Sequence, residues 1–213
     1  DLTLGKPARG NKVADCLIGT DVTGEIAVPN ITGIVLGNPG GINILSYNPI
    51  DTTIGGLGAN DGNLVSGNKH DGIVMLGNQF DGANKVLGNI VGLNAGGTKA
   101  LGNGGNGIVI ASQNDAQIGG PNAESKNIIS GNGGHGIYIS KTDNNLSRRT
   151  RIQGNLIGPN KLLEDAGNLR DGIRIDQGAL NSVIGGTGLV QNALAAAANT
   201  IAYNHGNGIA VQG

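Results

Sequence analysis

The sequence predicts an all-β protein folded as a parallel β-helix, and three observations carry that prediction. The phrase Ile-Gly-Gly recurs at Ile54, Ile118 and Ile184, at intervals of 64 and 66 residues, which indicates a repeat architecture. Glycine makes up 41 of the 213 residues, whereas only six are proline. The apolar residues form short runs that end in Asn or Gly, two residues that tolerate the left-handed backbone of tight corners. Strands this short pair stably only if each coil of chain stacks on the previous one.

Six strands of the form Gly-Ile-x-apolar are expected to line the interior, because two apolar residues flank an outward one, as the two-residue period of a strand requires. These strands are Ile34–Leu36, Ile73–Met75, Ile108–Ile110, Ile137–Ile139, Ile173–Ile175 and Ile209–Val211. Other short strands are expected at Lys85–Leu87, Gln117–Gly119, Ile128–Ser130, Ile152–Gln153 and Val183–Ile184. The corner Asn residues are expected to stack on one another and to form hydrogen-bonded ladders.

The repeat extends over nearly the whole chain, which predicts one elongated domain over residues 1–213. Three internal super-repeats are expected, at approximately 11–76, 84–140 and 150–211, and they are expected to form about six to nine coils. Little helix is expected apart from a short turn over 191–198, where a run of Ala has high helix propensity. The chain is expected to be either a trimmed product or a piece of a longer array.

Composition limits the classes of partner. The net charge is −1 and no basic stripe crosses the chain, so nucleic-acid binding is not expected. The single cysteine, Cys16, excludes an intramolecular disulfide framework, and it stands where sister repeats have a corner Asn. No run of about 18 apolar residues occurs, so membrane insertion is not expected. Aromatic residues make up 2% of the chain, so the core must consist of stacked aliphatic side chains.

Three recurring phrases, GNLIG at 154–158, NIISGNGGHGIYI at 127–139 and SVIGG at 182–186, resemble the right-handed parallel β-helix repeat proteins of bacteria. This group is the pectate-lyase-like superfamily in its broad sense. The resemblance covers almost the whole chain, and it alone implies that the coils are right-handed. The architecture serves lyases, hydrolases, epimerases, adhesins and surface filaments, so the resemblance does not select among these functions.

His135 lies in the sequence Gly-Gly-His-Gly-Ile-Tyr-Ile, which is similar to a strand of polygalacturonases where a His lies beside the catalytic carboxylates. Hydrolysis of a glycosidic bond takes two carboxyl groups, one as acid and one as base. That family supplies them partly from an adjacent Asp-Asp pair, and this sequence contains none. We therefore interpret His135 as the polar residue before a Gly-Ile strand, equivalent to Asn106.

A second candidate site lies in the segment Leu-Arg-Asp-Gly-Ile-Arg-Ile-Asp at 169–176. Arg174 and Asp176 are outward residues of one strand, and Tyr138 is expected to occupy the Arg174 column one coil earlier. A Tyr beside Arg and Asp is suited to bind sugar, by ring stacking and charge-assisted hydrogen bonds. A solvated surface ion pair is the alternative. If the chain were catalytic, His135, Asp171, Arg174 and Asp176 are the residues that would carry the chemistry. No metal site is assigned, and Ca²⁺ is the only cofactor that the acidic residues leave open.

The uniform repeats and the lack of an acid–base pair favour a non-catalytic structural, adhesive or filament-forming module at the cell surface or outside the cell. The expected partners are another copy of the chain, end to end, or further repeats of the same polypeptide, because neither end carries a polar cap over its open strand edges. A polysaccharide is a further expected partner. Two alternatives remain open: a lyase or hydrolase that acts on polysaccharide, and a carbohydrate-binding module without turnover.

Overall fold

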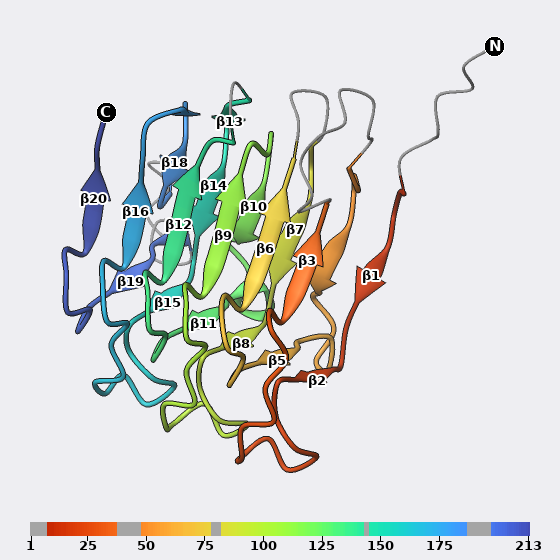
Figure 1. Ribbon diagram of the computed structural model, residues 1–213, viewed down its shortest axis with the longest axis vertical. Coiled ribbons are helices and arrows are strands. Elements are labelled where there is room, and N and C mark those ends of the chain that lie inside the picture. The colour runs from red at the N-terminus through yellow and green to blue at the C-terminus, as the bar shows by residue number, and fades with distance from the viewer. Residues whose placement is uncertain (1–7, 38–47, 78–81, 143–144, 187–196) are drawn as a thin grey trace.

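The chain forms a right-handed parallel β-helix, as the sequence predicts (Figure 1). The computed structural model describes residues 8–37, 48–77, 82–142, 145–186 and 197–213. Within these ranges, three parallel sheets of six strands each enclose one narrow interior, and each of six coils contributes one strand to every sheet. The coil number lies at the lower end of the expected range.

The strands of each sheet follow one another at intervals of one coil (Figure 1). The first sheet contains β1 (Lys12–Val13), β4 (Thr53–Gly55), β7 (Lys85–Leu87), β10 (Gln117–Gly119), β14 (Arg151–Gln153) and β18 (Val183–Ile184). The second contains β2 (Leu17–Ile18), β5 (Leu64–Val65), β8 (Ile90–Val91), β11 (Ile128–Ile129), β15 (Leu156–Ile157) and β19 (Thr200–Ile201). The third contains β3 (Ile34–Leu36), β6 (Ile73–Leu76), β9 (Ile108–Ala111), β12 (Ile137–Ser140), β16 (Ile173–Ile175) and β20 (Ile209–Val211). A small fourth sheet pairs β13 (Ser147–Arg148) with β17 (Ala179–Leu180).

The third sheet has the register that the sequence predicts, with isoleucine stacked on isoleucine inside. The first inward column contains Ile34, Ile73, Ile108, Ile137, Ile173 and Ile209. Its four middle members are fully buried, and they pack against the inward residues of the other two sheets. The outward column beside it contains Val35, Val74, Val109, Tyr138, Arg174 and Ala210. The core is therefore aliphatic, and the chemistry of this sheet lies outside.

The corners are held by asparagine ladders, which confirms another prediction. In one ladder, each Asn donates its backbone N–H and its side-chain Nδ2 to the Oδ1 of the Asn one coil later. Its members are Asn30, Asn68, Asn103, Asn132, Asn168 and Asn204. A second ladder runs through Asn63, Asn89, Asn127, Asn155 and Asn199, and the corner residue Cys16 precedes it by donating its N–H to Asn63 Oδ1 at 3.1 Å.

Space requires the glycine before five of the six strands of the third sheet, from Gly33 to Gly172; Gly208 alone has room for a Cβ. A Cβ on Gly136 would lie 2.6 Å from the carbonyl oxygen of Gly172 and 2.7 Å from Cγ2 of Ile157. Real Cβ atoms do not approach other atoms this closely, so the backbone can adopt this corner only if residue 136 has no side chain. The Gly-Ile phrase that marks the repeat is therefore the point where the chain turns tightly over the interior.

Sequence reasoning missed most of the second sheet. Its strands are two residues long, so they contain too few residues to show an alternating pattern. The strand expected at Ile128–Ser130 ends at Ile129, because Ser130 begins the next corner. Residues 191–196 of the predicted helical turn lie outside the described residues. Of the two described residues of this turn, Ala197 is helical and Ala198 is not. The other helix in the described part of the chain is a single 3₁₀ turn, η1 (Ala123–Ser125).

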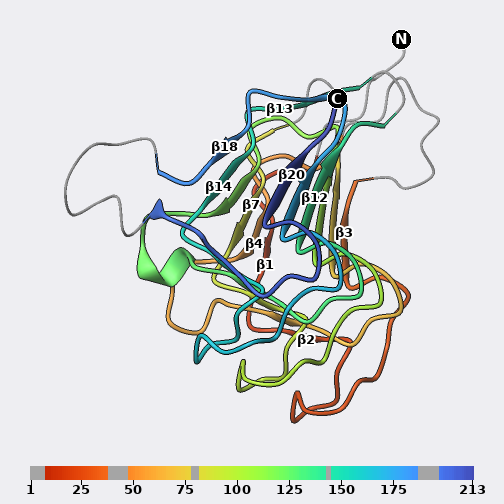
Figure 2. The same ribbon diagram turned by 90° about the vertical axis from the view of Figure 1, so that its left-hand side faces the viewer.

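Three hairpin loops project from the same side of the solenoid, on coils one, three and five (Figure 2). We call them hairpin 1 (residues 20–27), hairpin 3 (93–100) and hairpin 5 (159–165). The second residue of each hairpin is Asp21, Asn94 or Asn160, and its side-chain oxygen accepts backbone N–H groups from residues further along the same loop. No helix among the described residues is long and apolar enough to cross a membrane.

Candidate functional site

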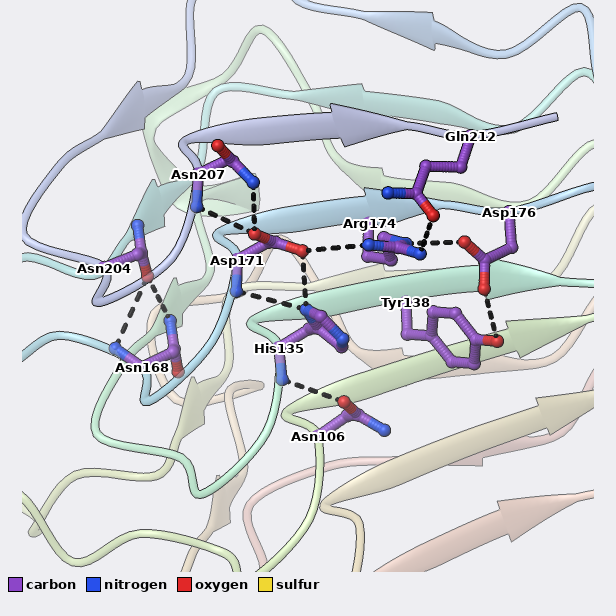
Figure 3. Close-up of polar contacts among 10 residues, drawn as sticks. All are labelled: Asn106, His135, Tyr138, Asn168, Asp171, Arg174, Asp176, Asn204, Asn207 and Gln212. Carbon is purple, nitrogen blue, oxygen red and sulfur yellow. Dashed lines mark hydrogen bonds and ion pairs between the residues drawn. The ribbon is translucent and has the colours of Figure 1, made fainter.

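The three residues predicted to bind ligand come together on the outer face of the third sheet (Figure 3). Tyr138 lies directly beside Arg174 across the β12–β16 pair. The Tyr138 hydroxyl donates a hydrogen bond to Asp176 Oδ2 at 2.9 Å, and Arg174 Nε donates to Asp176 Oδ1 at 2.5 Å. Arg174 Nη2 also bonds to Gln212 on the next coil. Asp176 therefore fixes both the phenol and the guanidinium, and the site is organised without a ligand.

A polar ladder borders this cluster, at the position before each Gly-Ile strand (Figure 3). The backbone N–H of His135 donates to Asn106 Oδ1 at 2.8 Å, and the N–H of Asp171 donates to His135 Nδ1 at 3.1 Å. The N–H of Asn207 then donates to Asp171 Oδ1 at 2.7 Å. His135 thus occupies the same ladder position as Asn106, as the sequence predicts. Unlike Asn106, it also lies against Tyr138, with ring centroids 5.7 Å apart and ring planes 25° from parallel.

A groove of about 500 Å³ opens beside the two rings. Its floor is the backbone of two Gly-Gly corners, at Gly104–Gly105 on coil three and Gly133–Gly134 on coil four. The equivalent corners carry Lys69 and His70 on coil two and Leu169 and Arg170 on coil five. Two successive corners without side chains therefore lie between two corners that have them. Its remaining lining residues are Asn106, His135, Tyr138, Arg170, Arg174 and Asp176.

The two carboxylates at this site are ionised. The hydrogen bond from Arg174 holds the pKa of Asp176 below its usual value, and the Tyr138 hydroxyl adds to the effect. Burial opposes ionisation of Asp171, but the backbone N–H and side-chain amide of Asn207, together with the nearby charge of Arg174, lower the pKa of Asp171 overall. Asp171 Oδ2 also lies 3.6 Å from Arg174 Nη1. A general acid requires a raised pKa, so neither carboxyl group is prepared for that role.

His135 is neutral in this environment. Burial lowers its pKa below 6.5, and although the Asp171 carboxylate 3.2 Å away favours the charged ring, Arg170 and Arg174 oppose it. Because Nδ1 accepts the Asp171 N–H, the proton of the neutral ring lies on Nε2. Burial also raises the pKa of Tyr138, and the hydrogen bond to Asp176 adds to that shift. The two rings therefore present an uncharged aromatic surface.

Arg170 supplies charge that is not already neutralised. It is exposed at the rim of the groove, and its side chain has no hydrogen-bond or ion-pair partner among the described residues. Arg174, by contrast, is paired with Asp176. The groove thus combines two rings, one fixed guanidinium and one free guanidinium, which suits a polyhydroxylated ligand that carries acidic groups.

Sequence reasoning placed Tyr138, Arg174 and Asp176 together, and it named Asp171 and His135 without predicting their mutual contact. It also placed Arg170 in the same segment, but it missed Gln212 and the Gly-Gly corners that form the floor. The signal for the floor was present, because Gly104–Gly105 and Gly133–Gly134 replace larger residues at sister positions. In a chain with 41 glycines, however, two additional pairs do not stand out.

The described residues contain no group of three His, Cys, Asp or Glu side chains placed to hold a metal ion. Comparison with known protein families, curated proteins and solved structures finds no match for this chain. The site must therefore be interpreted from its own geometry.

Proposed function

We propose that this chain is a non-catalytic, extracellular adhesive module that binds an acidic polysaccharide in the groove beside Tyr138. We also infer from the repeated phrases and the coil geometry that it belongs to the pectate-lyase-like superfamily in the broad sense. The observation that carries the functional proposal is the Tyr138–Arg174–Asp176 cluster above a floor of glycine. Each part of it has a role in binding a sugar chain.

The two rings supply the apolar surface that a sugar ring requires. The apolar face of a pyranose packs on aromatic rings, and Tyr138 and His135 are held in place by Asp176 and by the polar ladder. The glycine floor lets the ligand approach the backbone closely. Arg174 is fixed by Asp176, so little side-chain entropy is lost when it donates hydrogen bonds to a ligand.

Charge supports an acidic ligand over a neutral one. Arg170 has no carboxylate partner within the described residues, and a sugar carboxylate would provide a bidentate partner. The two carboxylates that hydrolysis would need are instead ionised and hydrogen-bonded. Asp176 accepts hydrogen bonds from Arg174 and Tyr138, and Asp171 accepts hydrogen bonds from Asn207. This arrangement favours binding without turnover over a hydrolase or lyase.

The test is affinity electrophoresis in gels that contain polygalacturonate, alginate or uncharged dextran. The wild-type chain is expected to be retarded by at least one acidic polymer and not by dextran. Tyr138→Ala should weaken binding by about tenfold, which corresponds to about 1.4 kcal/mol. Val109→Ala is the matched control, because Val109 holds the same outward position one coil earlier and does not line the groove.

Two outcomes would contradict the proposal. If neither acidic polymer retards the chain, the groove is not a site for acidic glycans. If the chain shortens either polymer, as seen from new reducing ends or from unsaturated products, and if Asp176→Asn abolishes that cleavage, the chain is an enzyme.

A further inference from the structure

The three hairpins stack on one another, and each contact repeats the same geometry (Figure 2). The N–H of Ala95 in hairpin 3 donates to the carbonyl of Gly24 in hairpin 1 at 3.0 Å. The N–H of Lys161 in hairpin 5 donates to the carbonyl of Gly97 in hairpin 3 at 2.8 Å. In both contacts, the third residue of one hairpin thus meets the fifth residue of the hairpin two coils earlier.

Each end of this stack leaves half of such a contact open. Val22 is the third residue of hairpin 1, its N–H has no partner in the described part of the chain, and the residue is 89% exposed. Leu163 is the fifth residue of hairpin 5, its carbonyl accepts no hydrogen bond from the described residues, and the residue is 59% exposed. An apolar side chain and one backbone group are therefore exposed on each side.

Leu163 is held in an unfavourable conformation for this exposed position. Its φ is 65°, close to the 69° of Gly24 and the 68° of Gly97. Glycine adopts this left-handed region freely, whereas a leucine there is strained. Leu163 is one of nine such non-glycine residues among those described, and strain of this kind clusters at functional sites such as ligand clamps and switch regions. Leu163 leaves more than half of its surface exposed in the single chain, and a stacked hairpin would cover this surface.

The asparagine ladder that runs from Asn30 to Asn204 has complementary unpaired groups at its two ends. Asn30 donates to Asn68 but its own Oδ1 accepts nothing from the described residues. Asn204 accepts from Asn168 while its backbone N–H is unpaired among the described residues. Neighbouring members of the ladder are joined by a bond from the N–H of one Asn to the Oδ1 of the next. Asn30 therefore offers an open acceptor for such a bond, and Asn204 offers an open donor.

We propose that the C-terminal coil of one copy binds the N-terminal coil of a second copy in the register of the solenoid. The described residues form six coils, an even number, so hairpin 1 of a second copy stacked in register falls two coils after hairpin 5 and continues the stack. Val22 N–H then meets the Leu163 carbonyl, the two side chains pack together, and Asn204 N–H meets Asn30 Oδ1. The C-terminal coil also buries Ile209 and Val211, which are 46% and 71% exposed. Repetition of this contact gives a head-to-tail filament.

One position in this contact is unfavourable, and it provides a test of the register. Asn94 and Asn160 use their side-chain amides to bond to the preceding hairpin, at Glu25 and at the Thr98 carbonyl. Hairpin 1 has Asp21 at this position, and in the stack Asp21 faces Glu164 of the other copy. Two carboxylates there repel each other, so stacking should strengthen as salt screens them. Asp21→Asn restores the residue of the sister hairpins and should lower the concentration at which copies associate.

The decisive experiment is site-directed cross-linking in a Cys16→Ser background. A Cβ on Gly24 would lie 2.7 Å from the Cβ of Ala95, and one on Gly97 3.3 Å from that of Lys161, so equivalent positions are close enough for a disulfide after a small adjustment. Val22→Cys and Leu163→Cys are made in separate chains. Under mild oxidation, a mixture of the two should give a covalent dimer, whereas each alone should give far less.

The assignment is wrong if the mixture yields no more dimer than either variant alone. It is also wrong if sedimentation velocity shows that the wild-type chain is monomeric up to its solubility limit at high salt. Leu163→Gly separates stacking from folding: it should raise the melting temperature of the dilute chain by relieving strain, and yet reduce association. An increase in association on Leu163→Gly would contradict the proposed contact. None of these outcomes depends on polysaccharide binding.

Discussion

The inner and outer faces of the third sheet come from the same six strands, but only the inner face repeats strictly. Six isoleucines form the first inward column, from Ile34 to Ile209. The neighbouring outward column changes from three valines to Tyr138 and Arg174. An inward side chain must fit between two neighbours and two other sheets, whereas an outward side chain needs only to be tolerated by solvent. Packing therefore imposes the repeat inside, and ligand chemistry becomes possible where the outside departs from it.

The largest effect that tests this comparison is expected from Ile137→Ala. Ile137 is fully buried in the middle of its column, so the variant loses both apolar burial and packing, at a cost of about 2–5 kcal/mol in the free energy of unfolding. Tyr138→Ala, one residue further and outward, should cost clearly less. Urea unfolding followed by circular dichroism measures both. Equal losses would show that inward and outward positions do not differ as the column packing indicates.

The inward face was also the part that sequence could predict. Every strand of the third sheet was located from Gly-Ile-x-apolar, because a buried column and a tight glycine corner leave the same pattern on each coil. The second sheet was largely missed for the opposite reason. Strands such as Leu17–Ile18 are too short to alternate, and only their pairing with neighbouring coils defines them.

At the site, sequence could predict which residues share an outward face but not how they interact. The column of Tyr138 and Arg174 follows from register alone. The bond from Tyr138 to Asp176 depends on the direction of the side chains, and the groove depends on which corners lack side chains over successive coils. These properties arise between coils, so no single stretch of sequence contains them.

A second prediction extends the comparison to polar columns. Asn132 is fully buried within its ladder; its Oδ1 accepts from Asn103, and its amide donates to Asn168 and to two carbonyls. Asn132→Ala leaves several buried groups unpaired, at about 1–3 kcal/mol for each. Part of that loss is offset because water enters the space. The expected result is a clear decrease in the urea midpoint.

Asn204→Ala is the matched control for this variant. Asn204 is the last member of the same ladder, it is only partly buried, and water can reach the groups that it leaves. Its replacement should cost less than that of Asn132. A larger loss at Asn204 would mean that the ladder stabilises mainly the end of the solenoid.

The smallest effect is expected from His135→Asn, which converts a variable outward position to the residue of its neighbour Asn106. Asn106 Oδ1 accepts an N–H from the following coil, so an Asn at 135 should accept the Asp171 N–H and keep the ladder intact. Above neutral pH, wild type and variant should therefore have nearly the same melting temperature.

The two proteins should differ when the pH falls, because burial lowers the pKa of His135 in the folded chain below 6.5. The unfolded chain then binds a proton that the folded chain resists, so the wild type loses stability as the pH falls from about 6.5 toward the folded pKa. Asp171 opposes this loss, and Arg170 and Arg174 increase it. The variant lacks the titrating ring, so its melting temperature should depend less on pH in this window. Thermal melts at closely spaced pH values measure the difference, and an identical pH dependence in the two proteins would show that His135 is not the buried neutral base described above.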